Sequence, residues 1–162
     1  MFARDYVDLD RPFPDVALRF VPDTDWLVPL AERAVRSARA LIDRLAGDAG
    51  DAPDDRVVDG GPVRCDTGPV RTAGVGILVP VSITVDGGSA LPHLVGELEV
   101  APVGHLHSQV SVNVTYRRPT PSDARHRVER AVAAGLREFL RGIAEHVDAP
   151  APGSRRVDRT VR

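Results

Sequence analysis

The sequence predicts an α+β protein whose antiparallel sheet is covered by a long C-terminal helix. Between residues 63 and 116, apolar side chains recur at every second position of several runs, the pattern of half-buried strands. Residues 29–46 and 122–147 instead place apolar side chains three and four positions apart, the pattern of helices with one buried face. The last two runs are joined by a short Pro-Val-Gly connection, whereas parallel neighbours need a crossover of about a dozen residues or more. We therefore expect antiparallel strands.

Composition and charge bound the class of protein. The chain has 162 residues, enough for one domain, which we expect to span residues 1–147. Its 43% hydrophobic and 27% charged residues are ordinary for a globular protein, which excludes a disordered, collagen-like or membrane-embedded chain. All 21 basic residues are Arg, but 23 acidic residues leave a net charge of -2. No nucleic-acid partner is therefore expected.

Two further features concern the location of the protein. The start of the chain carries an acid at Asp5 and has no apolar signal segment, and the longest uncharged run, residues 72–85, is shorter than the roughly 20 residues of a membrane-spanning helix. The single cysteine, Cys65, cannot form an internal disulfide. We expect a cytoplasmic protein without membrane insertion, in which Cys65 is a small buried or half-buried side chain.

The N-terminal part is predicted to hold a strand and a helix, followed by a loop. Residues 4–10 alternate loosely and end at a Pro-Phe-Pro sequence that terminates a strand. The helix of residues 29–46 has Pro29 in its first turn, or starts earlier at a cap on Asp23, Thr24 or Asp25. Residues 47–61 are rich in Asp, Gly and Pro, but the aspartates lack the spacing of a calcium-binding EF-hand loop. A flexible acidic loop is predicted there, without a metal site.

The strands are predicted from residue 63 onward. One ends at Gly68, and the run of residues 75–85 carries an aliphatic side chain at every odd position. Pro80 within that run requires a sheet edge or a bulge, because it has no N–H to donate. A turn is expected at residues 86–88. Residues 94–100 and 106–117 each alternate between an apolar and a polar face, as in a hairpin.

The C-terminal helix is predicted to start at a cap on Ser122 or Asp123 and to run to Val147. Gly135 in its middle indicates close packing or a gentle bend. Residues 148–162 are rich in Pro, Ala and Arg without periodicity, and they are predicted to form a disordered tail.

Three stretches together resemble a known family. They are the sequence GELEVAPVG from Gly96 to Gly104, the strand end YRRP at residues 116–119, and a helix that opens with HRV at residues 126–128 and contains Phe139-Leu140. They resemble the stand-alone SRPBCC proteins of high-GC bacteria, in the START-like, helix-grip superfamily, with the best likeness over residues 63–147. The resemblance implies a curved antiparallel sheet gripping the C-terminal helix, often around an apolar cavity for lipids, sterols or polyketides. The acidic loop stands where this family has a further strand.

The apolar faces of the strands and of the last helix are first of all a core, and they line a cavity only if the sheet curves away from the helix. Only 4% of the residues are aromatic, so filling the volume under a broad curved sheet is difficult. Tyr116 is the one polar group in this wall. The predicted ligand-binding residues are Ile77, Val79, Val81, Leu98, Val112, Val114, Tyr116, Leu136, Phe139 and Leu140.

The sequence shows no catalytic, metal-binding or cofactor-binding signature. His105 and His107 are expected to be exposed in a turn, His126 and His146 at the surface, and His93 in a loop without an evident partner. We predict a non-enzymatic protein that holds a hydrophobic small molecule between the sheet and the C-terminal helix. An enzyme of the polyketide-cyclase or aromatase type is one alternative, and a module that binds a partner chain through a sheet edge or the tail is another. The oligomeric state stays open.

Removal of the residues after Asp148 should leave the fold intact, because they carry no apolar periodicity. The thermal midpoint of the truncated chain should stay within a few degrees of that of the full chain. A larger drop would show that the tail docks on the domain.

Overall fold

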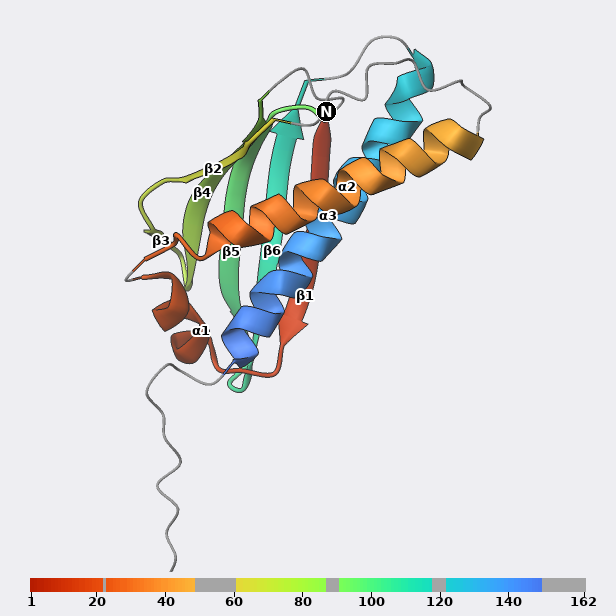
Figure 1. Cartoon of the computed structure of the whole chain (residues 1–162). Coiled ribbons are helices and arrows are strands. Elements are labelled where there is room, and N and C mark those ends of the chain that lie inside the picture. Colours follow the sequence, from red (N-terminus) through yellow and green to blue (C-terminus); the bar gives the residue numbers. More distant parts are fainter. Residues whose placement is uncertain (22, 49–60, 87–90, 118–121, 150–162) are drawn as a thin grey trace, which may run out of the picture.

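The computed structural model describes residues 1–21, 23–48, 61–86, 91–117 and 122–149 (Figure 1). The elements in chain order are β1 (Phe2–Leu9), α1 (Phe13–Phe20), α2 (Leu27–Asp48), β2 (Val63–Thr67), β3 (Arg71–Ala73), β4 (Gly76–Val85), β5 (Leu94–Val103), β6 (His107–Tyr116) and α3 (Ser122–Asp148).

A curved antiparallel sheet forms one layer, and the two long helices form the other (Figure 1). The strand order is β1-β6-β5-β4-β2, and the short β3 also pairs with β4. Helix α3 packs on β1 and β6, while α2 packs beside α3 and against β2. This arrangement is the helix-grip fold, so the predicted α+β class and the long C-terminal helix on the sheet are confirmed.

Alternation along the strands decides which side chains face the helices. Val79 of β4 lies opposite Leu98 of β5, which in turn lies opposite Val112 of β6. All three side chains are buried under the helices. Pro80, the residue after Val79, pairs with Glu97, the residue before Leu98, and both lie on the outer face. A slip of one residue would exchange the two faces, so the apolar alternation selects this register.

Pro80 lies where the outer neighbour of β4 is interrupted. Pairing with β2 ends at Val81 and pairing with β3 begins at Leu78, so residues 68–70 leave the ladder between them. The Gly68 N–H donates to the Pro80 carbonyl at 2.9 Å. In an antiparallel strand the N–H and C=O of one residue point toward the same neighbour, so the N–H that Pro80 lacks would face this gap. The predicted bulge is confirmed.

The structure adds two short elements to those that the sequence predicts. Helix α1 follows the Pro-rich end of β1, and Pro14 in its first turn occupies a position where a missing N–H breaks no helical hydrogen bond. Val16 and Phe20 bury one face of this helix. The short β3 pairs with the start of β4. The predicted helix of residues 29–46 is confirmed and extends over Leu27–Asp48.

Two apolar residues predicted to lie on the buried face are exposed in turns instead. Val75 is 77% exposed beside Gly74, whose φ of +58° belongs to the turn before β4. Leu106 is 67% exposed in the turn between β5 and β6. The inward position at the start of β6 belongs to Ser108, which is buried and donates its hydroxyl to the Arg11 carbonyl at 2.7 Å.

Helices α2 and α3 approach each other through small residues. A Cβ at Gly135 would lie 3.3 Å from the Ala34 carbonyl oxygen and 3.4 Å from the Ala38 Cβ. Gly142, two turns further along α3, faces Leu30 and Arg33 in the same way. Of the two reasons offered for Gly135, close packing is the one that the structure shows.

Some predicted features lie outside the described residues: most of the acidic loop of residues 47–61, where the family's further strand would fall, the end of the turn at residues 86–88, and the tail after Ala149. Among the helices that the structure does describe, none has the length and apolar character to cross a membrane.

Leu140→Ala should destabilise the protein by about 2–5 kcal/mol, because this side chain is 1% exposed between α3 and the sheet. Leu18→Ala is the matched control, since Leu18 is also helical and is 67% exposed. Its free energy of unfolding should change by less than roughly 0.5 kcal/mol. Urea midpoints measure both, and equal losses would contradict the placement of α3.

Candidate ligand-binding site

All the residues predicted to bind a ligand lie in one buried cluster. Three come from β4, one from β5, three from β6 and three from α3, and the most exposed of them, Ile77, is only 9% exposed. The sheet and α3 therefore bring the predicted wall together. Its side chains pack against one another and against α2 as a core.

A cavity of about 30 Å³ lies beside this cluster, between the two helices and the sheet. Of the predicted ligand-binding residues, Leu136 and Phe139 line it. The other lining residues lie on α2, on α3, on β4, at the start of β5 and in the segment just before it. These residues are Ala34, Val35, Ala38, Ile83, Leu91, Pro92, Leu94, Val132 and Gly135.

The α2 part of this lining is absent from the sequence-based site. The apolar spacing of the predicted helix indicates that one of its faces is buried, and this face includes Ala34, Val35 and Ala38. The spacing does not indicate which part of the protein that face packs against. Leu91 and Pro92 precede a strand in a stretch without periodicity. Only the packing of α2 on α3 brings these residues to one place.

The cavity is apolar and small. Every side chain that lines it is apolar. A volume of 30 Å³ is about one water molecule's share of the liquid, whereas pockets for drug-sized ligands measure roughly 300–1,000 Å³. An apolar ligand of ordinary size therefore requires the walls to separate.

Tyr116 is buried and pairs with Leu94, one of the lining residues, across β5 and β6. Burial raises the pKa of its phenol, the negative charge of Glu129 raises it further, and Arg125 opposes the effect. The phenol is therefore neutral at physiological pH and can both donate and accept a hydrogen bond. Arg125 and Glu129 pair with each other at 2.9 Å on the first turns of α3.

The histidines do not form a catalytic or metal-binding group. His107 lies 3.2 Å from Asp10 and is exposed, as the turn predicted. His93, for which no partner was expected, contacts the Ser82 hydroxyl at 2.8 Å on the outer face. Within the described segments, no three His, Cys, Asp or Glu side chains gather closely enough to hold a metal ion.

His146 is not the surface residue that the sequence predicts. Its ring stacks on Trp26 with centroids 4.1 Å apart and planes 4° apart, so the end of α3 contacts the segment just before α2. The Trp26 Nε1–H donates to the carbonyls of Arg19 and Asp23. Burial lowers the pKa of His146, and the positive charge of Arg19 lowers it further. The imidazole is therefore neutral at pH 7.

Cys65 is half-buried, as predicted. Burial is the main reason that its pKa rises to about 11, and Asp66 adds to the rise. A thiol with this pKa is protonated at neutral pH, which makes it a poor nucleophile.

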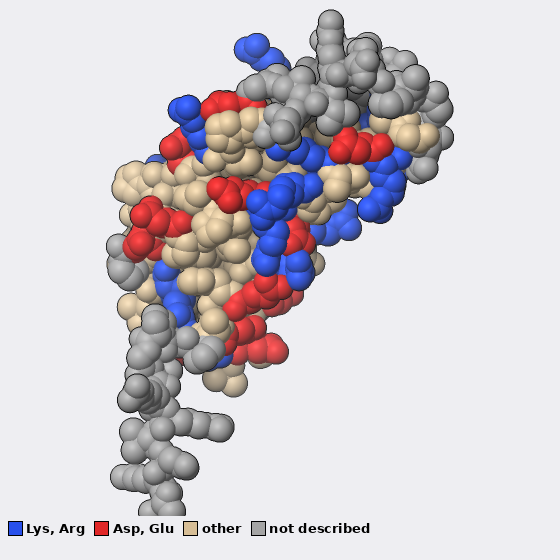
Figure 2. Space-filling view, viewed as in Figure 1, with Lys and Arg blue, Asp and Glu red and all other residues tan. Residues whose placement is uncertain are grey.

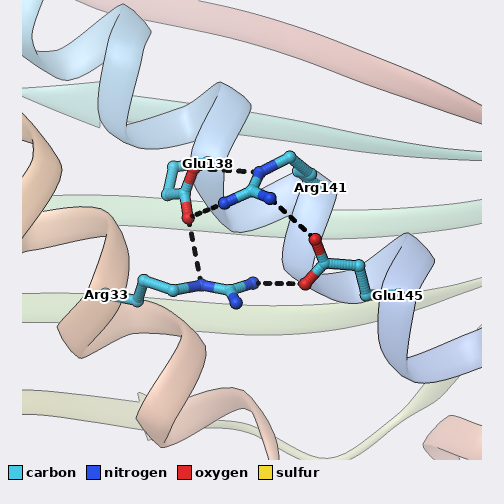
Figure 3. Close-up of polar contacts among 4 residues, drawn as sticks. All are labelled: Arg33, Glu138, Arg141 and Glu145. Carbon is cyan, nitrogen blue, oxygen red and sulfur yellow. Dashed lines mark hydrogen bonds and ion pairs between the residues drawn. The ribbon is translucent and has the colours of Figure 1, made fainter.

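Charged side chains border the α2–α3 contact on its outer side (Figure 3). Arg33 of α2 lies 3.0 Å from Glu138 and 3.0 Å from Glu145, both on α3. Arg141 donates to the same two carboxylates at 2.5–3.1 Å. The Nε of Arg33 is buried and close to Glu138 without the alignment of a hydrogen bond. Figure 2 shows both signs of charge mingled over the two helices on this face.

Comparison with known proteins adds few constraints. No protein-family model matches the sequence, and no curated protein matches it significantly. Three solved structures are similar over most of their length. TTHA0849 from Thermus thermophilus is 14% identical, with 91% of this chain and 97% of that chain covered and a TM-score of 0.48.

The other two are more distant in geometry. The Zhui aromatase/cyclase from Streptomyces sp. R1128 is 12% identical, with coverage of 91% and 93% and a TM-score of 0.41. Ara h 8.0201 is 14% identical, with coverage of 91% and 97% and a TM-score of 0.43. At these values the likenesses carry no argument about ligand or activity, and the helix-grip assignment rests on the strand order and helix placement of this chain.

Acidification from pH 7.5 to 5.5 should destabilise the protein. The folded-state pKa of His146 lies below the ordinary value of 6.5, so the unfolded chain takes up the proton first. This contribution to stability is complete above pH 6.5 and is lost as the pH falls through the folded pKa. His146→Phe keeps a ring on Trp26 but cannot titrate, so its urea midpoint should stay level across this range.

The pKa values of Glu129 and Glu138 are lowered from the ordinary value of 4.5, so these carboxylates change charge below this pH range. A protonated imidazole on an indole face also gains cation–π attraction. If that attraction outweighed burial, the wild-type midpoint would rise on acidification, and burial would be the wrong cause.

Proposed function

We propose that this protein binds a hydrophobic small molecule in the interior between its sheet and the helices α2 and α3. The cavity described above carries the proposal, because it lies where both helices meet the sheet and its lining is wholly apolar. The residues predicted from the sequence would form the deeper wall once the cavity widens. No catalytic step and no cofactor belong to the proposal.

The lining favours a molecule that is apolar over most of its length. No charged or hydrogen-bonding side chain lines the cavity, so a ligand with many polar groups would lose its hydration without compensation. Tyr116, opposite Leu94, is the polar handle for a single hydroxyl, carbonyl or acid group at one end. A lipid-like chain with one polar end fits these features best.

An enzyme of the cyclase type would need an acid and a base that point into the same interior. Besides the single phenol of Tyr116, which cannot be both the acid and the base, the buried polar side chains among the described residues are Ser108 and Ser111. The first bonds to a backbone carbonyl, and the second faces Glu99 at 3.5 Å. Neither supplies acid–base chemistry, so binding remains the proposal. Its location would be cytoplasmic, because an unpaired thiol suits a reducing compartment.

Fluorescence titration with cis-parinaric acid, an apolar chain with one acid group, tests the proposal. The wild type should bind it saturably at one site per chain. Ile83→Phe places a ring into the cavity from β4 and should weaken binding by about tenfold or more. Thr84→Phe adds the same ring to the outer face of the same strand and should leave the affinity unchanged.

Each result bears on a separate part of the proposal. A wild type that binds neither cis-parinaric acid nor a long-chain alcohol would remove the ligand-binding function. Equal affinities of the two variants would place the bound probe away from this cavity. Urea midpoints of the variants distinguish lost binding from lost folding.

A further inference from the structure

We infer that α2 is the movable wall of the binding site: its second half, from Ala38 to residue 47, swings away from α3 to admit the ligand, while the first half of α2 stays anchored. The inference rests on the proposed function and names how access to the same site is controlled. It follows from the size of the cavity, the chemistry of its walls and the burial along α2.

Some wall must move, because the cavity of about 30 Å³ is roughly a tenth of the smallest pocket that holds an ordinary ligand. Four parts of the protein border the cavity: the sheet, α3, α2 and the two-residue segment of Leu91 and Pro92. The sheet is held by continuous pairing from β1 to β2 and cannot widen without breaking ladder hydrogen bonds. We therefore compare the two helices, which supply seven of the eleven lining residues.

Helix α3 is the more firmly held of the two. Leu136, Phe139, Leu140 and Ile143 bury large side chains against the sheet, each at most 2% exposed. Beside the cavity, the closest contact of α2 with α3 is made instead by Ala34 and Ala38 against Gly135. Small side chains cover little apolar area, so parting α2 from α3 exposes less to water than lifting α3 from the sheet.

Burial along α2 shows which half can move. Residues Leu27, Ala31, Ala34, Val35 and Ala38 are buried. None of residues 39–47 is buried to the same degree; each is half-buried or exposed. In Figure 1 this end of α2 projects past the strands beside the start of α3. A helix end with few buried side chains opens at a lower free energy than the core.

The first half of α2 is tied to the rest of the protein by several contacts. Trp26 stacks on His146 of α3, and the hydroxyls of Thr24 and Thr67 lie 2.6 Å apart, which links this end to β2. Arg33 bridges to Glu138 and Glu145 one turn before the crossing (Figure 3). These contacts define a pivot between residues 24 and 33, so the opening lies at Ala38 and beyond.

A reversible cross-link across the crossing tests the inference. The Ala38 Cβ lies 3.4 Å from the position of a Cβ at Gly135, close to the spacing of about 3.5–4.5 Å in disulfides. Ala38→Cys and Gly135→Cys are introduced together in a Cys65→Ala background, which removes the native thiol. The oxidised protein should lose cis-parinaric acid binding at least tenfold relative to the same protein after reduction.

The oxidised and reduced forms have almost the same side chains in the cavity. A difference in their affinity for cis-parinaric acid therefore reports the movement of α2 and not a change in cavity volume. Equal binding by both forms would overturn the inference and leave the proposed function standing. Failure of the unaltered protein to bind the probe would overturn both. The variant with Ala38→Cys alone in the same Cys65→Ala background has a single thiol and cannot cross-link within the chain, so it should bind alike under both conditions.

Hydrogen exchange provides a second measurement that does not depend on the disulfide. In the unaltered protein the amides of residues 38–47 should exchange at least tenfold faster than those of residues 31–37, and cis-parinaric acid should change mainly the exchange of residues 38–47. Equal protection of the two halves would overturn the inference even if the double variant fails to fold.

Discussion

The close contact between α2 and α3 is the constraint on which the rest of the structure depends. With alanines facing Gly135, the two helices lie near enough to share one face of a single sheet. A larger side chain at that position would push them apart and uncover the apolar side chains of β4 and β5. The ion pairs around Arg33 add to this contact at its outer side, where water screens them.

This contact also accounts for the size of the cavity. In a sheet that grips one helix, the space beside that helix is open to a ligand. Here Leu27, Val35 and other buried residues of α2 occupy that space, and the cavity is what remains near Ala38. The helix-grip fold and the near-solid core of this chain are therefore compatible with the proposed binding, which requires the space that α2 fills.

Polar groups are kept out of the interior by local pairing. The Ser108 hydroxyl and the Trp26 Nε1–H each find a backbone carbonyl, and the carboxylates of α3 pair with arginines on the outer surface. The cavity itself therefore offers an apolar guest no competing hydrogen-bonding side chain.

Periodicity along the chain was enough to predict the main strands of the sheet, the two long helices and the burial of every residue assigned to the ligand wall, because each depends on neighbours in sequence. Helix α1 was not predicted, because its Pro residues are as typical of a break in secondary structure as of the first turn of a helix. The cavity was decided by tertiary structure alone. Ala34 and Ala38 meet Gly135 only after the intervening strands have folded into the sheet, and no local pattern specifies which buried stripe faces which.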